Sequence, residues 1–524
     1  MPISSDSRGD TNPSPQAEPL GIWRWIALAF VSLVALGLRL FCLSCKPIWF
    51  DEAFSVEVAR VTWPNFLHLL WWREANMSFY YLLLRGWLHF GQSPFFVRSL
   101  SALIAAATVA VVYWLGSLLY DRRTGLIAAA FLAFNAYHIR YAQEARSYAL
   151  FALLATLSCG FLIAFLQQPS RTRRISYLLT SILAFYAHFY ALLLIVAQWL
   201  ALRCVDDARS ASEGSGSAGE PWVVNAKNIL KNWRIITGGA VPVLIFVAKT
   251  GAGPIKWIKR PGISYLARFT GDITNGWPVI YLVGCALAMF VVGRNLFRPR
   301  KTWNEWRVQF LSIWLLFPVL LTVLLSLARP VFLPRYMIFC IPALVILTAA
   351  GIGSIRPIWL SGVAAGAILL LSARSVPFIY SHDFDTERDG SIAASDFILN
   401  HSLPNDAVLF HIAETRIPYE YVRSLRSGKN TASPGFNLHL GPEIVFPYHG
   451  PGLDYRDFTG KPSPDLLRKE LPRYSNVWVM LMNNGTPMKP DPTTVMLSEI
   501  LPQMFPRIQN WQFAKVELRL YGKQ

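Results

Sequence analysis

Charge is scarce in this sequence, and negative charge is scarcer than positive. Only 15% of the 524 residues are charged, and 49 Lys and Arg residues stand against 31 Asp and Glu residues. Soluble proteins carry about 25% charged residues on average. The shortage of charge therefore excludes an ordinary soluble enzyme and indicates a protein that lies largely in a membrane.

Cysteine is also scarce, and it is absent from the polar region after residue 375. That region must therefore fold without disulfides. Cys42 and Cys45 form a CxxC pair, but without a second pair this is a weak sign of a metal or redox site, and packing is the expected role. All six cysteines lie in or beside apolar runs: Cys42, Cys45, Cys159, Cys204, Cys285 and Cys340.

Long apolar runs fill most of the first 375 residues. Apolar residues make up 53% of the sequence, and several runs reach the roughly 20 residues that a helix needs to cross a bilayer. We therefore predict a polytopic α-helical membrane protein with about 11 spans. These spans are expected at 23–43, 95–119, 124–139, 147–167, 175–188, 189–204, 234–250, 276–293, 308–327, 336–352 and 357–374.

Basic residues predict the orientation in the membrane. Clusters of Arg and Lys fall in every second connection, at 122–123, 171–174, 203–234 and 294–307. Because cytoplasmic loops are enriched in Lys and Arg, the N-terminus is expected in the cytoplasm and the C-terminal region outside. The net charge of +18 is explained by basic cytoplasmic loops and by basic residues that bind anionic headgroups or a lipid phosphate. Nucleic acid is therefore not an expected partner.

The sequence also divides into regions of different composition. Met77–Phe90 is too short to span and is expected to lie on the outer surface of the membrane. The C-terminal region reads as a helix at 392–401 and strands at 405–411, 477–482 and 513–521. The expected parts are a disordered cytoplasmic leader (1–20), a transmembrane module (21–375) with a first outer loop (44–94), a cytoplasmic linker (205–232), an outer loop (251–274) and a small extracytoplasmic α/β domain (380–524).

An acidic pair, Asp51 and Glu52, follows the first predicted span between aromatic residues. Burying even one carboxylate near lipid costs several kcal/mol. The pair is therefore a candidate for catalysis. The alternative is a solvated helix start, where Asp and Glu are favoured by the helix dipole.

Further polar residues fall at later turns on the same predicted side. Arg140, Glu144 and Tyr148 are spaced to share one face of a helix, although an ion pair that caps a span would give the same pattern. His188 marks the next outward turn, where packing at the interface is the plainer alternative. Arg146 lies beside the first group.

The last such turn contains Arg329, Arg335 and Tyr336. Pro334 suits the first turn of a helix, so Arg335 is expected at a positive helix end. Arginines at such an end can bind phosphate, whereas anchoring of Arg and Tyr in lipid headgroups is the alternative. Carboxylates beside phosphate-binding cations favour group transfer, because an acceptor needs a base and a departing phosphate needs positive charge.

On these residues the sequence resembles the GT-C membrane glycosyltransferases. The resemblance is to glycosyltransferase family 39, the protein O-mannosyltransferase-like group that includes the lipid A aminoarabinose transferases. It covers about 20–375, and the tail resembles the outer domain of bacterial members. The matching stretches are Asp51–Glu52, Phe79–Leu83, Val97–Leu103, His138–Tyr148, His188–Tyr190, Pro334–Tyr336 and, in the tail, Asn405–Val408.

The resemblance implies transfer of a sugar, with inversion, from a polyprenyl-phosphate donor to a hydroxyl or amine of a lipid, glycan or protein. It implies that Asp51 is the base and that Glu52 supports it or binds the acceptor. It also implies a bacterial inner membrane protein with a periplasmic site. The candidate donor and substrate residues are Arg98, Glu144, Arg146, Tyr148, His188, Arg329, Arg335 and Tyr336.

Three points stay open at this stage. The family usually has a Pro-Pro or His-Pro pair where this chain has Asn76–Phe79, which leaves the acceptor class open. No metal-ligand spacing is evident, although Asp51 and Glu52 could recruit a divalent cation. The rival functions are a transporter or flippase of lipid-linked sugars, which the few ionisable residues at mid-span disfavour, and an inactive binding or scaffold protein.

Overall fold

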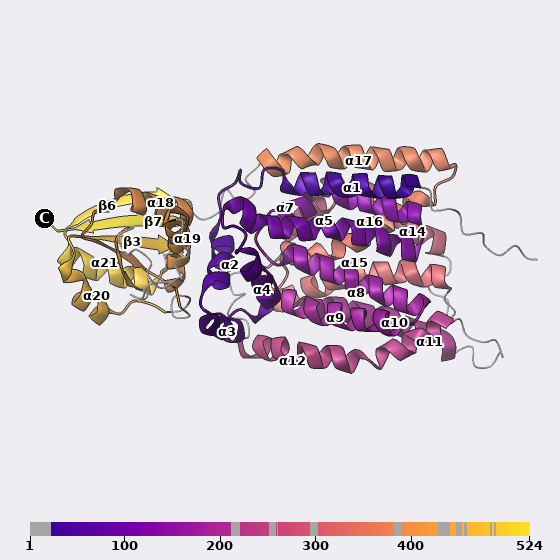
Figure 1. The fold of residues 1–524 in the computed structure, drawn as a ribbon, viewed down its shortest axis with the longest axis horizontal. Helices are drawn as coiled ribbons and strands as arrows, with labels where there is room; N and C mark the ends of the chain where they lie inside the picture. Colours follow the sequence, from indigo (N-terminus) through magenta and orange to yellow (C-terminus); the bar gives the residue numbers. More distant parts are fainter. Residues whose placement is uncertain are drawn as a thin grey trace, which may run out of the picture.

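The protein is described here from a computed structural model, which is an elongated molecule with a helical bundle and a smaller sheet-containing part at one end (Figure 1). The described residues are 22–210, 221–250, 258, 260–293, 302–381, 390–427, 441–446, 453–454, 458, 460–482, 485–486 and 489–523. The expected leader at 1–20 lies outside the described residues, as do 211–220 of the linker and most of 251–259.

The bundle consists of long helices that run between its two ends (Figure 1). Its helices are α1 (Ile22–Leu40), α5 (Pro94–Leu119), α6 (Arg122–Ala133), α7 (Ala136–Ala142), α8 (Tyr148–Gln167), α9 (Arg171–Ala187), α10 (Ala191–Ser210), α11 (Pro221–Leu230), α12 (Trp233–Thr250), α13 (Ile263–Ile273), α14 (Pro278–Gly293), α15 (Trp303–Ala328), the 3₁₀ helix η3 (Pro334–Cys340), α16 (Ile341–Gly353) and α17 (Ile358–Ser381).

These helices confirm a polytopic membrane protein. Within the described residues, seven segments are long and apolar enough to span, or eight if the bent pair α13–α14 counts as one span. The predicted span at 124–139 is divided between α6 and α7, the span at 175–188 falls on α9, and the span at 189–204 falls on α10, whose apolar part Ala191–Arg203 is short. The count of 11 therefore stays a prediction.

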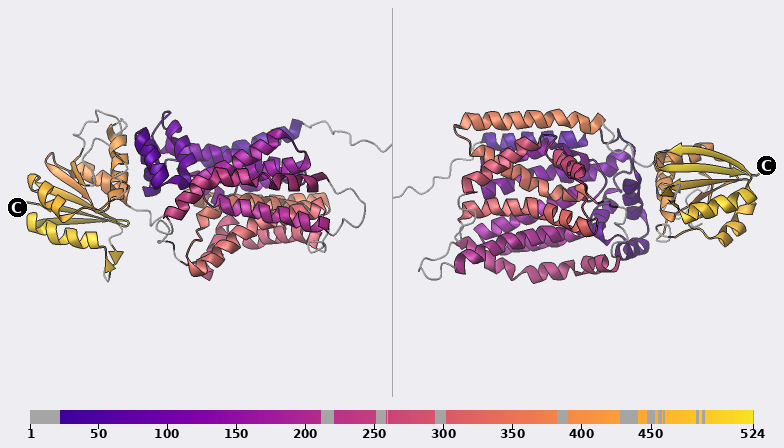
Figure 2. Two further views of the ribbon diagram at one scale, coloured as in Figure 1. Left: turned by 90° about the horizontal axis from the view of Figure 1, so that it is seen from below. Right: turned by 180° about the vertical axis from the view of Figure 1, so that it is seen from behind.

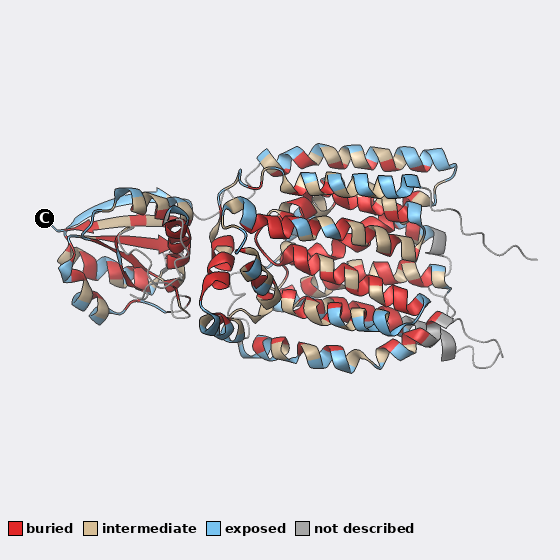
Figure 3. Cartoon of the chain, viewed as in Figure 1, coloured by how far each residue is buried: buried red, intermediate tan, exposed pale blue. Residues whose placement is uncertain are grey.

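Burial follows the distribution of apolar residues around each helix. Helix α8 is apolar on all sides and lies in the centre, as does the segment formed by η3 and α16; their most apolar windows are 83% and 89% buried. Helices α1 and α17 instead lie on the outside of the bundle (Figures 2 and 3). They expose large apolar side chains such as Phe30, Leu33 and Leu370, which suits contact with lipid.

Small residues allow the helices to approach closely. A Cβ atom on Gly116 of α5 would lie only 2.8 Å from Cα of Gly125 in α6. Side chains larger than hydrogen would push these two helices apart, which is why small residues are common where membrane helices cross.

Short helices cover the end of the bundle nearest the sheet-containing part (Figure 1). They are α2 (Phe50–Arg60), α3 (Trp63–Trp72), the 3₁₀ helix η1 (Ala75–Met77) and α4 (Ser78–Trp87). Helix α4 falls within the surface helix expected at 77–90, and its 10 residues are too few to span.

The C-terminal part folds around a five-stranded mixed sheet with strand order β2-β1-β3-β7-β6. Strand β1 pairs in parallel with β2 and β3, while β7 pairs antiparallel with β3 and β6. The strands of this sheet are β1 (Asp406–Phe410), β2 (Glu443–Phe446), β3 (Asn476–Met482), β6 (Arg507–Phe513) and β7 (Val516–Gly522). Strands β4 (Gly485–Thr486) and β5 (Lys489–Pro490) form a separate two-stranded antiparallel sheet. The helices are α18 (Ser391–His401), η4 (Ala413–Thr415), α19 (Arg416–Ser427), α20 (Pro464–Glu470), η6 (Leu471–Arg473) and α21 (Pro492–Met504).

Three sequence-based expectations need correction. The strand expected at 513–521 crosses a hairpin: β6 ends at Phe513, Lys515 has φ of 58° in the turn, and β7 begins at Val516. The linker expected at 205–232 contains helix α11, and the loop expected at 251–274 contains helix α13. Alternating polarity along 513–521 did not distinguish a hairpin from a single strand. Short polar runs in 205–232 and 251–274 did not distinguish segments that contain a helix from loops.

Helix α19 docks the C-terminal part on helix α2. Arg60 of α2 donates a hydrogen bond to Ser424 Oγ at 2.6 Å and lies over the ring of Tyr421. The ring of Phe54 meets that of Phe458 edge-on at 5.3 Å. The C-terminal part therefore contacts the short helix that also carries the candidate catalytic carboxylates.

Candidate active site

Helix α2 presents Asp51 and Glu52 in different directions. Both lie in its first turn, and neighbouring residues on an α-helix project about 100° apart. The Asp51 side chain is 24% exposed, whereas that of Glu52 is completely buried. Only Asp51 is therefore open to a substrate.

Glu52 is held by Arg98 of helix α5. Arg98 donates from Nε to Glu52 Oε1 at 2.8 Å and from Nη2 to Oε2 at 2.7 Å. Glu52 Oε1 also accepts a hydrogen bond from the backbone N–H of Ala145 at 3.0 Å. The carboxylate thus ties α2 to α5 and to the turn before α8.

The remaining Arg98 N–H groups bind the loop between α1 and α2. They donate to the carbonyls of Leu43 (2.6 Å), Lys46 (2.8 Å) and Pro47 (2.8 Å). With the two bonds to Glu52, all five donors of the guanidinium are used. Binding of donor phosphate by Arg98 does not fit these contacts, and neither does binding of an acceptor by Glu52, because both side chains are taken up by groups of the protein itself.

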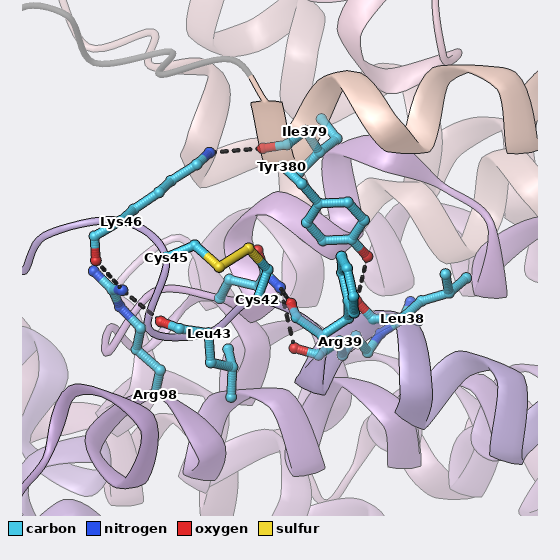
Figure 4. Close-up of a disulfide and its surroundings, with 11 residues drawn as sticks. Leu38, Arg39, Cys42, Leu43, Cys45, Lys46, Arg98, Ile379 and Tyr380 are labelled. Atoms are coloured by element: carbon cyan, nitrogen blue, oxygen red, sulfur yellow. Dashed lines mark hydrogen bonds between the residues drawn. A yellow bond between two sulfur atoms is a disulfide. The ribbon is translucent and has the colours of Figure 1, made fainter.

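A disulfide between Cys42 and Cys45 closes this loop (Figure 4). The packing role expected for the CxxC pair was therefore wrong. Lys46, just after the disulfide, donates to the carbonyl of Ile379 near the end of α17 at 2.6 Å. The disulfide thus constrains the same short loop whose carbonyls hold Arg98.

Two arginines flank Asp51. Arg146 Nη2 and Arg335 Nη1 lie 3.8 and 3.7 Å from Asp51 Oδ2. Arg146 also donates to the Asp51 carbonyl and to Ser55 Oγ, both at 3.4 Å. Burial alone would lower the pKa of Arg146, but Asp51 outweighs it with help from Tyr148, and the pKa lies well above its ordinary value. The Arg146 guanidinium therefore stays charged.

Aromatic rings line the site around Arg335. Its guanidinium carbon lies 5.9 Å from the ring centre of Trp49 and 5.8 Å from those of Tyr148 and Tyr336. His188 packs behind Tyr336, with 4.5 Å between the ring centres. This placement fits the packing alternative for His188, whereas Tyr148 and Tyr336 stand beside the cation.

Glu74, which the sequence reasoning did not single out, belongs to the same site. It accepts a hydrogen bond from the Tyr81 hydroxyl at 3.2 Å. Burial raises the pKa of Glu74, while Arg146 and Arg73 oppose this and Asp51 adds to it. No residue spacing marks Glu74; its position in the first outer loop is the signal that could have found it.

Three further expectations change with the structure. Arg140 and Tyr148 do not share a helix with Glu144, because α7 ends at Ala142 and α8 starts at Tyr148. Glu144 is buried in the intervening turn. Arg329 is exposed at the end of α15, and no contact with the other candidate residues is found for it in the described part of the chain.

A divalent cation does not fit the acidic pair. Glu52 points to Arg98 and Asp51 faces two arginines, so the two carboxylates cannot share an ion. Within the described ranges, no three His, Cys, Asp or Glu side chains gather as metal ligands would.

Buried charged residues lie where helix α19 meets helix α2, the helix that also carries Asp51. Glu57 accepts from Arg60 at 2.5 Å, and Glu420 accepts from Arg416 at 2.8 Å. Burial raises the pKa of Glu57 to about 7; Arg60 and Arg416 oppose the rise, and Glu420 adds to it. The contact between the two parts of the molecule therefore contains a carboxyl that titrates near neutral pH.

Comparison with solved structures identifies the architecture as that of the GT-C membrane proteins. The chain is similar to ArnT from Cupriavidus metallidurans in the apo state, with TM-score 0.61, 13% identity, and coverage of 96% of this chain and 100% of that one. For ArnT bound to undecaprenyl phosphate the TM-score is 0.56, again at 13% identity, with 96% and 99% covered.

A third similar structure is the Archaeoglobus fulgidus oligosaccharyltransferase in complex with Zn and sulfate, with TM-score 0.50, 11% identity, and coverage of 86% of this chain and 67% of that one. No protein-family model and no curated protein matches the sequence. At these identities the similarity establishes the fold, and the GT-C fold expected from the sequence is confirmed.

Proposed function

We propose that this protein transfers a sugar from a polyprenyl-phosphate donor to an acceptor hydroxyl or amine. The observation that carries the proposal is the partly exposed carboxylate of Asp51, which lies between Arg146 and Arg335. This arrangement occurs in a chain with the fold of ArnT, which has been solved with undecaprenyl phosphate bound.

Arg146 Nη2 and Arg335 Nη1 each lie more than 3.5 Å from Asp51 Oδ2, which is too long for a direct hydrogen bond to this carboxylate. A phosphate can take their N–H donors in charge-assisted hydrogen bonds while Asp51 remains beside it. Arg146 is fixed by the turn before α8 and Arg335 by η3. The two cations therefore converge from separate elements on one place.

In the proposed reaction, Asp51 takes the proton of the acceptor hydroxyl or amine as general base. The acceptor atom forms a bond to the anomeric carbon as the bond from that carbon to the phosphate oxygen breaks. The electron pair leaves with the polyprenyl phosphate, whose charge Arg146 and Arg335 stabilise. Attack opposite the leaving phosphate gives inversion.

The other residues shape the site. Tyr148, Tyr336 and Trp49 provide aromatic surface around Arg335, which suits the apolar face of a sugar ring. Glu74 offers hydrogen-bonding capacity to sugar or acceptor hydroxyls. Glu52 and Arg98 hold the start of α2, and with it Asp51, in place.

We place the site on the periplasmic side of a bacterial inner membrane, with the N-terminus cytoplasmic and 380–524 periplasmic. The basic connections of the sequence support this orientation. The Cys42–Cys45 disulfide supports it as well, because disulfides persist in oxidising compartments such as the periplasm.

The test compares lipids and glycans, by mass spectrometry, in cells with the gene, without it, and with Asp51→Asn. The proposal expects one polyprenyl-phosphate sugar to accumulate and one product to lose a sugar, equally in the deletion and the variant. Accumulation of a lipid-linked sugar on the cytoplasmic face with no change in any glycan would favour a flippase instead.

A further inference from the structure

A cavity of about 570 Å³ lies near the end of the bundle opposite the candidate active site. Arg24 of α1, Tyr113 and Ser117 of α5, and the first turn of α6 line it. Arg98, at the start of α5, belongs to the active-site end, and Ser117 lies 19 residues further along the same helix. At 1.5 Å per residue the two places are roughly 28 Å apart.

The cavity lies at the depth of lipid headgroups. Trp23 and Trp25, on either side of Arg24, are 76% and 55% exposed. Exposed tryptophans at the end of a membrane helix mark the boundary between hydrocarbon and headgroups. Arg24 at the cavity is therefore within reach of headgroup phosphates.

The side chains that line the cavity carry a net positive charge. Arg24, Arg122 and Arg123 contribute three positive charges against one negative charge from Asp121. Asp121 already accepts from the backbone N–H and the hydroxyl of Thr124, at 2.9 and 3.1 Å. An anion therefore fits the cavity better than a cation does.

Helix α1 also has an exposed apolar face, on the side of the helix away from Arg24 and the cavity. Ile26, Phe30 and Leu33 are 49%, 66% and 67% exposed, and their spacing places them on one face of α1. This face runs from headgroup depth toward the middle of the membrane. Its exposure indicates that lipid surrounds α1 at the end of the bundle where the arginines lie.

We propose that this cavity binds the phosphodiester headgroup of an anionic phospholipid. Guanidinium groups bind phosphate oxygens in paired hydrogen bonds, and basic pockets between membrane helices are suited to anionic headgroups. Because the cavity lies away from Asp51, this proposal is independent of the transfer reaction.

The test is native mass spectrometry of the purified full-length protein with phosphatidylglycerol or with phosphatidylcholine of the same acyl chains. The wild type retains phosphatidylglycerol preferentially. Arg24→Gln with Arg122→Gln weakens that binding by about fivefold for each arginine removed. Arg123 is left unchanged because it donates to the Ile358 carbonyl and to Ser361, which ties α6 to α17.

The matched control is Arg171→Gln with Arg174→Gln, which removes two exposed arginines at the start of α9, at the same end of the bundle but outside the cavity. The control keeps wild-type lipid binding. Thermal unfolding checks that each variant is folded, and Arg122→Gln alone replaces the double variant if that one is not. Equal loss in the control, equal retention of phosphatidylcholine, or displacement of the lipid by excess inorganic phosphate would overturn the proposal.

Discussion

The buried pair of Glu52 and Arg98 gives the most specific prediction about how the site is held together. Both side chains are almost inaccessible, at 0% and 2% exposure. Removing one member leaves the other charge buried without its partner, which costs about 3–5 kcal/mol. Replacing both by neutral residues leaves no charge uncompensated, so the double variant should lose less than the two single variants together, although three backbone carbonyls still lose Arg98 as their donor.

The perturbations are Glu52→Gln, Arg98→Met and the two together. Each single variant is expected to lower the free energy of unfolding by about 3 kcal/mol or more. The double variant is expected to lose less than the sum, with a coupling of about 1–3 kcal/mol. Unfolding by SDS in mixed micelles, followed by tryptophan fluorescence, measures all three against the wild type.

Activity should fall in the same variants although neither residue touches the substrate. Glu52 holds the N–H of Ala145, next to Arg146, and it lies next to Asp51. A displacement of about 1 Å in a reacting group costs about 100-fold in rate, so kcat should fall more than donor affinity. Additive effects of the two substitutions, or a fully stable and active Glu52→Gln variant, would refute this reasoning.

Three further predictions concern the arginines, the disulfide and the contact between the two parts. Arg146→Gln and Arg335→Gln should each weaken binding of the polyprenyl-phosphate donor by about 10- to 100-fold. Each substitution removes a hydrogen bond to a charged group, which is worth about 1.5–3 kcal/mol. Titration of each variant with labelled lipid phosphate measures the loss of affinity. Replacing Cys42 and Cys45 with Ser should lower the free energy of unfolding by about 2 kcal/mol from loop entropy and reduce kcat, measured by unfolding in SDS and by initial rates. The pKa of Glu57 is about 7 in the folded protein and about 4.3 in an unfolded chain, so between these pH values the folded state binds one more proton than the unfolded state does. The free energy of unfolding should therefore fall as pH rises from about 4 to about 7 and level off above pH 7. Hydrogen exchange of the α2 backbone, measured across this pH range, tests this prediction.

Each of these has a result that contradicts it. Unchanged donor binding in both arginine variants would remove the phosphate site. The Ser variants should match the wild type treated with reductant, and a wild type indifferent to reductant would show that the loop does not depend on its disulfide. Glu57→Gln should abolish the pH dependence between 4 and 7; persistence of the same dependence in that variant would assign it to another group.

Hydropathy and the placement of charge were enough to predict the membrane bundle. The apolar runs mark the helices because bilayer hydrocarbon requires long apolar segments. The acidic pair also located α2, since carboxylates are rare at such a position. Arg335 was predicted as a site residue from its turn and Arg146 from the family resemblance, and the structure brings both to Asp51.

The sequence could not distinguish a substrate-binding arginine from a structural one. Arg98 and Arg335 have the same chemistry, and only the folded chain reveals that five acceptors surround Arg98. The spacing of Arg140, Glu144 and Tyr148 looked helical, yet the chain turns between α7 and α8 and frees the N–H of Ala145 for Glu52.

The docking of the C-terminal part was not foreseen either. Tyr421 and Phe458 belong to the region predicted as a separate α/β domain, but both lie against α2. Contacts between residues some 360 positions apart, such as Arg60 and Ser424, leave no periodic signal in either segment. They depend on how two folded parts meet.

The most direct test of the account is the transfer activity of Asp51→Asn, measured with the lipid-linked sugar that accumulates in the deletion strain. Asn has nearly the shape of Asp but cannot act as a base, so transfer should fall by about 10²- to 10⁴-fold. Donor binding should be retained or become tighter, because Arg146 and Arg335 lose a competing carboxylate. Near-normal transfer by this variant would contradict the assignment of Asp51 as the catalytic base.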